Sequence, residues 1–142
     1  MSSNPKSAHN QPTADPVAHF KGIPWCAKLL SDKSVLQVMV PDRTPIPSTE
    51  STLVRETLNT PSSVKACVTF FRYIKPAAPA SETGEDKKNP FLQLCCLLDL
   101  ESGINGYAKT AHGGMYGVIL DEVMGTAANM QAGGLQHTGL EI

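Results

Sequence analysis

The sequence predicts an α+β fold, and two stretches of the chain carry most of this prediction. A mostly apolar segment follows His112-Gly113-Gly114 and stops at Gly133-Gly134, which predicts one helix of about 17 residues. Residues 91–98 form a continuous apolar run between Pro90 and Asp99, which is typical of a buried strand. Apolar side chains lie almost all round the predicted helix, so we expect it to be buried.

The size and composition of the chain limit the classes of function that it fits. Its 142 residues allow one domain, and a net charge of −1 gives no sign of a nucleic-acid or membrane partner. No apolar run approaches the ~20 residues of a membrane span, and residues 1–15 lack a secretion signal. We therefore expect a cytoplasmic protein without a metal or other cofactor. Its cysteines should be reduced: Cys26, Cys67, Cys95 and Cys96.

Local patterns predict the remaining elements in chain order. Residues 1–18 show no apolar pattern and are expected to form a disordered tail, which leaves 19–142 as the domain. Apolar residues recur with helical spacing over 23–30, and residues 34–40 alternate as a strand would. Residues 76–90 are polar and rich in proline, which predicts an exposed loop.

The segment over residues 61–74 has two interpretations. Thr60 is suited to cap a helix and Pro61 to begin it, and the apolar spacing that follows is helical. We therefore predict a helix, although its β-branched residues leave a strand as the alternative. A further candidate strand lies over residues 104–110, where Asn105-Gly106 is a strong turn signal.

The predicted C-terminal helix carries the candidate chemistry. Two adjacent carboxylates, Asp121 and Glu122, are costly in an apolar helix unless they have a role or a partner. The amides of Gly113 and Gly114 begin the helix without partners inside it, so they are suited to hold a developing oxyanion. Gly114 and Asp121 are seven residues apart and share nearly the same face. These are the parts needed to hydrolyse an acyl bond, although a glycine-led buried helix has the same pattern.

The motif also resembles a known family. His-Gly-Gly at residues 112–114, followed by a carboxylate nine residues after the histidine, resembles the hotdog-fold thioesterases. The segments Glu56–Pro61 and Pro24–Cys26 are similar to one subgroup of them, and the likeness covers roughly residues 23–132. The resemblance implies an α+β hotdog fold, in which an antiparallel sheet wraps round a central helix.

The resemblance implies catalytic roles for three residues. Asp121 occupies the position of the catalytic carboxylate, as general base or nucleophile. Gly113 would donate its backbone amide to the oxyanion. His112 would orient the carbonyl or the Gly113 amide, with a hydrogen-bonded histidine at the helix entry as the alternative.

Three further residues are implied at the substrate. Gly114 would permit close approach of the thioester. Glu122 is the second choice of carboxylate, or the partner in a structural salt bridge. Asn105 would help to position the nucleophile or water, with a turn asparagine as the alternative.

The substrate implied is an acyl group on coenzyme A or on an acyl carrier, in a homo-oligomer and within a biosynthetic pathway. Two other hypotheses stay open: a non-catalytic hotdog protein that binds acyl groups or a partner chain, and a truncated product of a thioesterase gene. The hypothesis of a truncated product arises because most strands of a hotdog fold normally follow the helix, and the sequence shows no strand after Gly134. On this basis we expect an incomplete sheet and a marginally stable chain.

Overall fold

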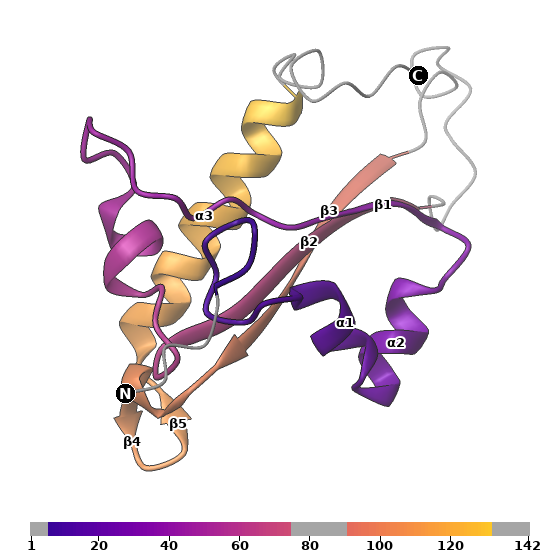
Figure 1. Ribbon diagram of the computed structural model, residues 1–142. Coiled ribbons are helices and arrows are strands. Elements are labelled where there is room, and N and C mark those ends of the chain that lie inside the picture. The colour runs from indigo at the N-terminus through magenta and orange to yellow at the C-terminus, as the bar shows by residue number, and fades with distance from the viewer. Residues whose placement is uncertain (1–5, 75–90, 132–142) are drawn as a thin grey trace.

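The computed structural model describes residues 6–74 and 91–131, and it confirms an α+β fold with antiparallel sheets (Figure 1). The main sheet has the strand order β1 (Val35–Met39), β2 (Val64–Ile74) and β3 (Phe91–Leu100). A small hairpin pairs β4 (Asn105–Tyr107) with β5 (Thr110–Ala111). The helices are α1 (Pro16–Lys21), α2 (Pro24–Leu30) and α3 (Gly113–Gln131), with a π-helical turn η1 (Leu53–Thr57) and a 3₁₀ turn η2 (Ser102–Ile104).

Helices cover both faces of the main sheet. In Figure 1, α1 and α2 lie on one side of the strands and α3 on the other. Each face has its own buried cluster. The first joins α1 and α2 to the sheet through Phe20, Cys26, Leu30, Ala66, Val68, Phe70 and Leu97. The second joins α3 to the sheet through Val64, Cys67, Ile104 and Met115.

An irregularity in β2 decides which side chains reach α3. The pairing of β2 with β3 shifts register between Val64 and Ala66. Beyond the shift, Ala66 and Val68 point to α1 and α2 while Cys67 points to α3. Because side chains alternate along a regular strand, Val64 would otherwise share the face of Ala66. The bulge instead directs Val64 to the α3 side.

The prediction of a helix over residues 61–74 is wrong, because this segment is the central strand β2. It pairs with β1 on one edge and with β3 on the other, and it is buried on both faces. A strand buried on both faces has no polar side, so its apolar residues match helical spacing by coincidence. The β-branched and aromatic residues of the segment favour the strand.

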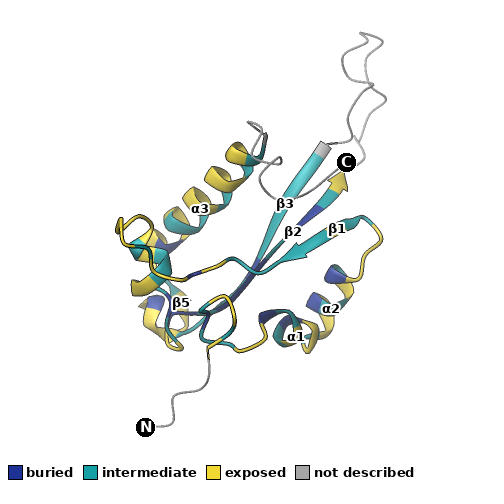
Figure 2. Ribbon diagram, turned by 45° about the horizontal axis from the view of Figure 1, so that its top comes forward, coloured by how far each residue is buried: buried dark blue, intermediate teal, exposed yellow. Residues whose placement is uncertain are grey.

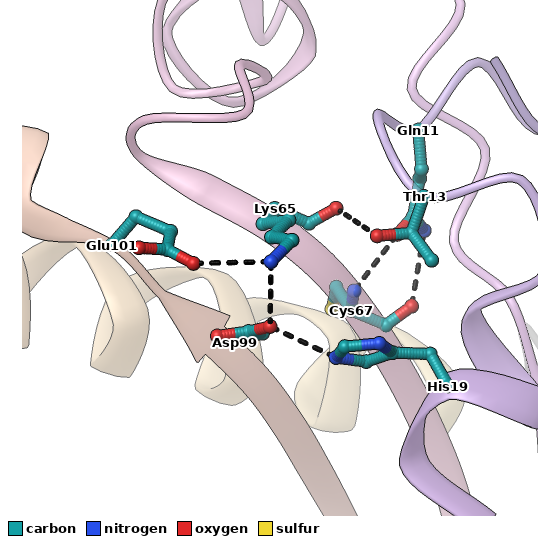
Figure 3. A network of polar contacts seen from close by, with 7 residues as sticks. All are labelled: Gln11, Thr13, His19, Lys65, Cys67, Asp99 and Glu101. Atoms are coloured by element: carbon teal, nitrogen blue, oxygen red, sulfur yellow. Dashed lines mark hydrogen bonds and ion pairs between the residues drawn. The ribbon is translucent and has the colours of Figure 1, made fainter. Parts of the chain in front are cut away.

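The expected disordered tail over residues 1–18 is contradicted from residue 6 onward, while residues 1–5 lie outside the described part. Gln11 is fully buried, and its side chain receives a hydrogen bond from the Cys67 amide (2.8 Å) and donates to the Cys67 carbonyl (3.0 Å). Thr13 bonds the Lys65 carbonyl through both its amide and its hydroxyl. The segment therefore occupies the edge of β2 beyond the end of β1 (Figure 3).

A network of polar contacts fastens α1 to the sheet beside this segment. His19 Nε2 lies 2.8 Å from Asp99 Oδ2, and Lys65 Nζ lies 3.2 Å from Glu101 Oε1 and 4.0 Å from Asp99 Oδ2 (Figure 3). These side chains come from α1, β2, β3 and the residue after β3. Their partial exposure screens the charges, so the network contributes more to the position of α1 than to stability.

The prediction that α3 is buried is wrong for most of its surface (Figure 2). One stripe of the helix packs on the sheet, whereas Tyr116, Leu120 and Met124 are 56%, 58% and 66% exposed. These three residues are four positions apart and form a continuous apolar row, which we call the outer row. The glycine stop predicted at 133–134 and the loop predicted at 76–90 lie outside the described residues.

Several other predictions are confirmed. The helix over 23–30 is α2, and the strands over 34–40 and 91–98 are β1 and β3. All four cysteines are free, as expected. The structure also shows that the adjacent Cys95 and Cys96 point to opposite faces of the sheet. In the parts of the chain that the structure describes, no helix has the length and apolarity to cross a membrane.

Candidate functional site

The first turn of α3 is organised by His112. The helix begins at Gly113, and the Gly114 amide donates a hydrogen bond to Nδ1 of His112 at 2.9 Å. His112 is therefore the N-cap of α3, with a ring nitrogen in the role that a serine or aspartate oxygen usually has. Its carbonyl accepts from the Met115 amide at 2.8 Å, which closes the first turn.

The two glycines of the motif have different surroundings. A Cβ on Gly114 would lie 3.1 Å from His112 Nδ1, so a side chain there would press on the capping ring. A Cβ on Gly113 would meet nothing within 4 Å. The Gly113 amide makes no hydrogen bond with any described residue. The free donor at the positive end of the helix is thus the Gly113 amide, and it lies in the open.

The β4–β5 hairpin holds the other side of His112. Asn105 pairs with Ala111 in this hairpin, and the His112 amide donates to the Ile104 carbonyl at 2.8 Å. A Cβ on Gly106 would lie 3.1 Å from two atoms of His112. The turn predicted at Asn105-Gly106 is therefore wrong: both residues belong to β4, and the chain reverses at residues 108–109. Asn105 is exposed beside the start of α3.

The two adjacent carboxylates of α3 lie on different sides of the helix. Glu122 is on the stripe that faces the sheet, seven residues after the buried Met115. Asp121 is exposed and belongs to the side of the outer row, as do Gly113 and Gly114. The motif residues and Asp121 thus share the open side of α3, and Glu122 does not. Among the described residues, neither carboxylate forms a salt bridge.

Gly113 and Asp121 are nevertheless separated along the helix. Eight residues at 1.5 Å each place them about 12 Å apart along the helix axis. A donor and a nucleophile that act on one carbonyl must each lie within about 3–3.5 Å of it. Within one chain, the Gly113 amide and the Asp121 carboxylate are therefore too far apart to contact the same thioester carbonyl.

A cavity of about 240 Å³ lies between the sheet-facing stripe of α3 and the sheet. Residues 41–43 and 51–58, which include the π-helical turn η1, complete its wall. The helix contributes Met115, Val118, Ile119, Glu122, Val123 and Thr126. The strands contribute Val64, Cys67, Thr69, Leu94, Cys96 and Leu98. The cavity is mostly apolar, as ligand sites generally are.

Two thiols and an arginine make one wall of the cavity polar. Cys67 Sγ and Cys96 Sγ lie 3.6 Å apart. The hydrogen bond from Cys96 holds the pKa of Cys67 below its ordinary value, against the effect of burial. The same contact, together with burial, raises the pKa of Cys96. Arg43, which is 8% exposed, lies on the same cavity, and its charge also favours the Cys67 thiolate.

Sequence reasoning missed this cavity and Arg43. Arg43 stands in a segment with three prolines, where no periodicity indicates which side chains point inward. Three of the other cavity residues, Val64, Cys67 and Thr69, come from β2, for which the sequence predicts a helix. No signal in the sequence links Arg43 to Cys67.

Comparisons with known proteins give no identity: no family model, no curated protein and no solved structure matches the chain. Within the described residues, no group of three or more His, Cys, Asp or Glu side chains is arranged to hold a metal ion.

Proposed function

We propose that this protein is an acyl-thioester hydrolase with a hotdog fold, in which α3 is the central helix. The observation that carries the proposal is the open Gly113 amide at the start of α3, on the same side of the helix as the exposed Asp121. A free amide at a helix N-terminus stabilises the negative charge that develops on a carbonyl oxygen under attack. His112 supports this role because it takes the Gly114 amide and leaves the Gly113 amide to the substrate.

A thioester is the acyl bond that best suits these groups. Its carbonyl is less stabilised by resonance than that of an oxygen ester, and a thiolate leaves readily. One carboxylate and one oxyanion donor therefore suffice. As a general base, Asp121 would take a proton from water while the water oxygen attacks the carbonyl; the C–S bond would then break, and the thiolate would receive that proton. As a nucleophile, Asp121 would displace the thiolate to form an anhydride, which water would hydrolyse to the free acid and the Asp121 carboxylate, with a proton left for the thiolate. The substrate proposed is an acyl group on coenzyme A or on an acyl carrier.

The distance between Gly113 and Asp121 along α3 requires a second copy of the chain to complete the proposed site. The ~12 Å between Gly113 and Asp121 is too long for one carbonyl, as computed from the helix rise. A second α3 that packs antiparallel on the outer row would bring its Asp121 opposite Gly113 of the first. Tyr116 and Leu120, which are exposed in the single chain, would then be buried between the two helices, and Met124 would lie beyond the start of the partner's helix. Their exposure in the single chain supports this arrangement, because contiguous apolar surface is typical of interfaces.

The direct test is turnover of a panel of acyl-CoA thioesters, measured by the release of free thiol. Asp121→Asn should keep the shape of the side chain and lower turnover by at least ~10², because the base or nucleophile is lost. Glu122→Gln is the matched control on the neighbouring carboxylate, and it should retain turnover. Loss in Glu122→Gln with full activity in Asp121→Asn would assign the chemistry to the cavity side instead.

A second candidate function is non-catalytic binding of an acyl group. The apolar cavity favours it, since the cavity lies on the opposite side of α3 from Gly113 and Asp121. Saturable binding of acyl-CoA without any thiol release, in a preparation that is dimeric, would favour binding over hydrolysis.

A further inference from the structure

Arg43 is a buried cation that the proposed hydrolysis does not use. Its backbone is fixed by the N-terminal segment: the Arg43 amide donates to the His9 carbonyl at 2.9 Å, and the Arg43 carbonyl accepts from Asn10 Nδ2 at 2.9 Å. The side chain extends from this anchor to the wall of the cavity and is 8% exposed. The guanidinium is thus held in place by the fold.

The Arg43 guanidinium lies against the Cys67 thiol, but no carboxylate among the described residues pairs with it. It forms no salt bridge with them, and its Nη1 atom is buried without a hydrogen bond. Guanidinium groups have five N–H donors and stay charged in proteins. Burial of such a charge without a counter-charge is strongly unfavourable, so buried arginines are normally paired.

The two carboxylates on the cavity wall do not fill this role. Asp42 accepts hydrogen bonds from the Thr44 amide (2.9 Å) and hydroxyl (2.7 Å) and is exposed. Glu122 is exposed and lies outside ion-pair distance of Arg43. The other arginine on the wall, Arg55, donates to the Thr44 carbonyl. Arg43 is therefore the buried cation on this wall, and among the described residues it has no carboxylate partner and an Nη1 atom without a hydrogen bond.

We propose that the cavity binds a small organic acid, whose carboxylate pairs with Arg43 and whose apolar body lies between α3 and the strands. The planar guanidinium fork matches the two oxygens of a carboxylate. Leu98, Ile119 and Val123 supply apolar contacts along the cavity. Exposed residues on the wall, such as Ser51 and Thr126, mark where a ligand would enter.

The volume of the cavity limits the size of the acid. About 240 Å³ corresponds to roughly eight groups of the size of a water molecule, at ~30 Å³ each. Hexanoate, with six carbons and two oxygens, is therefore a suitable probe. Binding of an acid in the cavity does not require hydrolysis, because Gly113 and Asp121 lie on the other side of the helix.

The first experiment uses the full chain and needs no variant. Hexanoate and hexanamide have the same number of non-hydrogen atoms, but only hexanoate carries a charge. Each compound is titrated into the protein, and binding is measured by calorimetry and by the NMR signal of the Arg43 side-chain Nε–H. Hexanoate should bind at least tenfold more tightly than hexanamide. Equal affinity for the two, or an unmoved Arg43 signal at saturation, would overturn the proposal.

The second experiment tests which arginine holds the carboxylate. Arg43→Met keeps an unbranched apolar stem and removes the charged guanidinium, so hexanoate should bind at least about tenfold more weakly. Arg55→Met is the matched control on the same cavity and should change the affinity less than about threefold. Glu122→Gln removes a repelling charge and should tighten binding. An equal loss in Arg55→Met and Arg43→Met, or weaker binding in Glu122→Gln, would place the anion elsewhere.

Discussion

The Gly114 amide donates a hydrogen bond to Nδ1 of His112 at 2.9 Å, and this contact decides which glycine amide is free. An accepting Nδ1 carries no proton, so the ring proton of the neutral imidazole is on Nε2. With Gly114 capped, the Gly113 amide is left without a partner among the described residues. The histidine of the motif therefore has a structural role that is separate from any contact with substrate.

Replacement of His112 should separate capping from chemistry. His112→Ala removes the cap and should lower the free energy of unfolding by about 0.5–2 kcal/mol. His112→Asn supplies another good capping side chain and should retain most of that stability. If His112 acts only as the cap, thioesterase turnover should follow stability in both variants. A stable His112→Asn protein with turnover reduced a hundredfold would instead show that the imidazole contacts the substrate.

Gln11 should be one of the most sensitive polar positions. Its side chain bonds both the amide and the carbonyl of Cys67, and all these atoms are buried. Gln11→Leu would leave the two buried groups of Cys67 unpaired and would also remove the bond from Gln11 Nε2 to the Pro41 carbonyl, so it should lower the free energy of unfolding by about 2–4 kcal/mol. Urea denaturation measures the loss. Gln93→Leu, which loses one contact with the side chain of Arg72, is the control and should cost less than half as much.

Acid should weaken the turn at Asp42. Hydrogen bonds from the Thr44 hydroxyl and amide hold the pKa of Asp42 below its ordinary value. Because the pKa is lower in the folded state, the stabilisation is present above the unfolded pKa of about 3.9 and is lost as the pH falls through the folded value. Asp42→Asn keeps an accepting oxygen but does not titrate. The melting temperature should therefore fall less steeply between pH 6 and pH 2.5 in Asp42→Asn than in the wild type. Equal slopes of melting temperature against pH would contradict this.

Helices and strands that have one exposed side or clear boundary residues could be predicted from the sequence. Pro24 begins α2 at the position where proline is tolerated, and the apolar run of β3 was identified from its length. The strand β2 was misassigned because both of its faces are buried, which removes the alternation that marks a strand. The N-terminal segment has no apolar pattern, because polar contacts such as those of Gln11 and Thr13 with β2 fix it to the sheet, and no local pattern reveals such contacts.

The candidate site also has a part that the sequence predicts and a part that only the folded chain reveals. The order His112, Gly113, Gly114 at a helix start follows from the sequence, because capping and free amides are local properties. The side of α3 on which each carboxylate lies depends on what packs against the helix, and this is a tertiary property. The role of Arg43 depends on the bulged β2 and on the segment after β1, so it could be recognised only in the folded chain.

The last prediction concerns the second copy of the chain. Gly113→Pro removes the N–H that would bind the oxyanion, and proline is well accepted at the first helical position. Gly113→Ala keeps the N–H and its Cβ meets nothing within 4 Å, so it is the matched control and should stay active. Gly113→Pro and Asp121→Asn should each be inactive alone if both groups are needed.

A mixture of these two inactive variants should recover activity if each site takes Gly113 from one copy and Asp121 from the other. In a two-fold dimer, half of a randomly exchanged equal mixture is heterodimer, and each heterodimer has one intact site of two. Turnover should therefore rise to about one quarter of the wild-type value. Leu120→Glu in the outer row should abolish this recovery, because it places a charge where the copies would pack. A mixture that stays as inactive as its two components, although light scattering shows that dimers exchange, would mean that both groups act within one chain or that this chain does not hydrolyse thioesters.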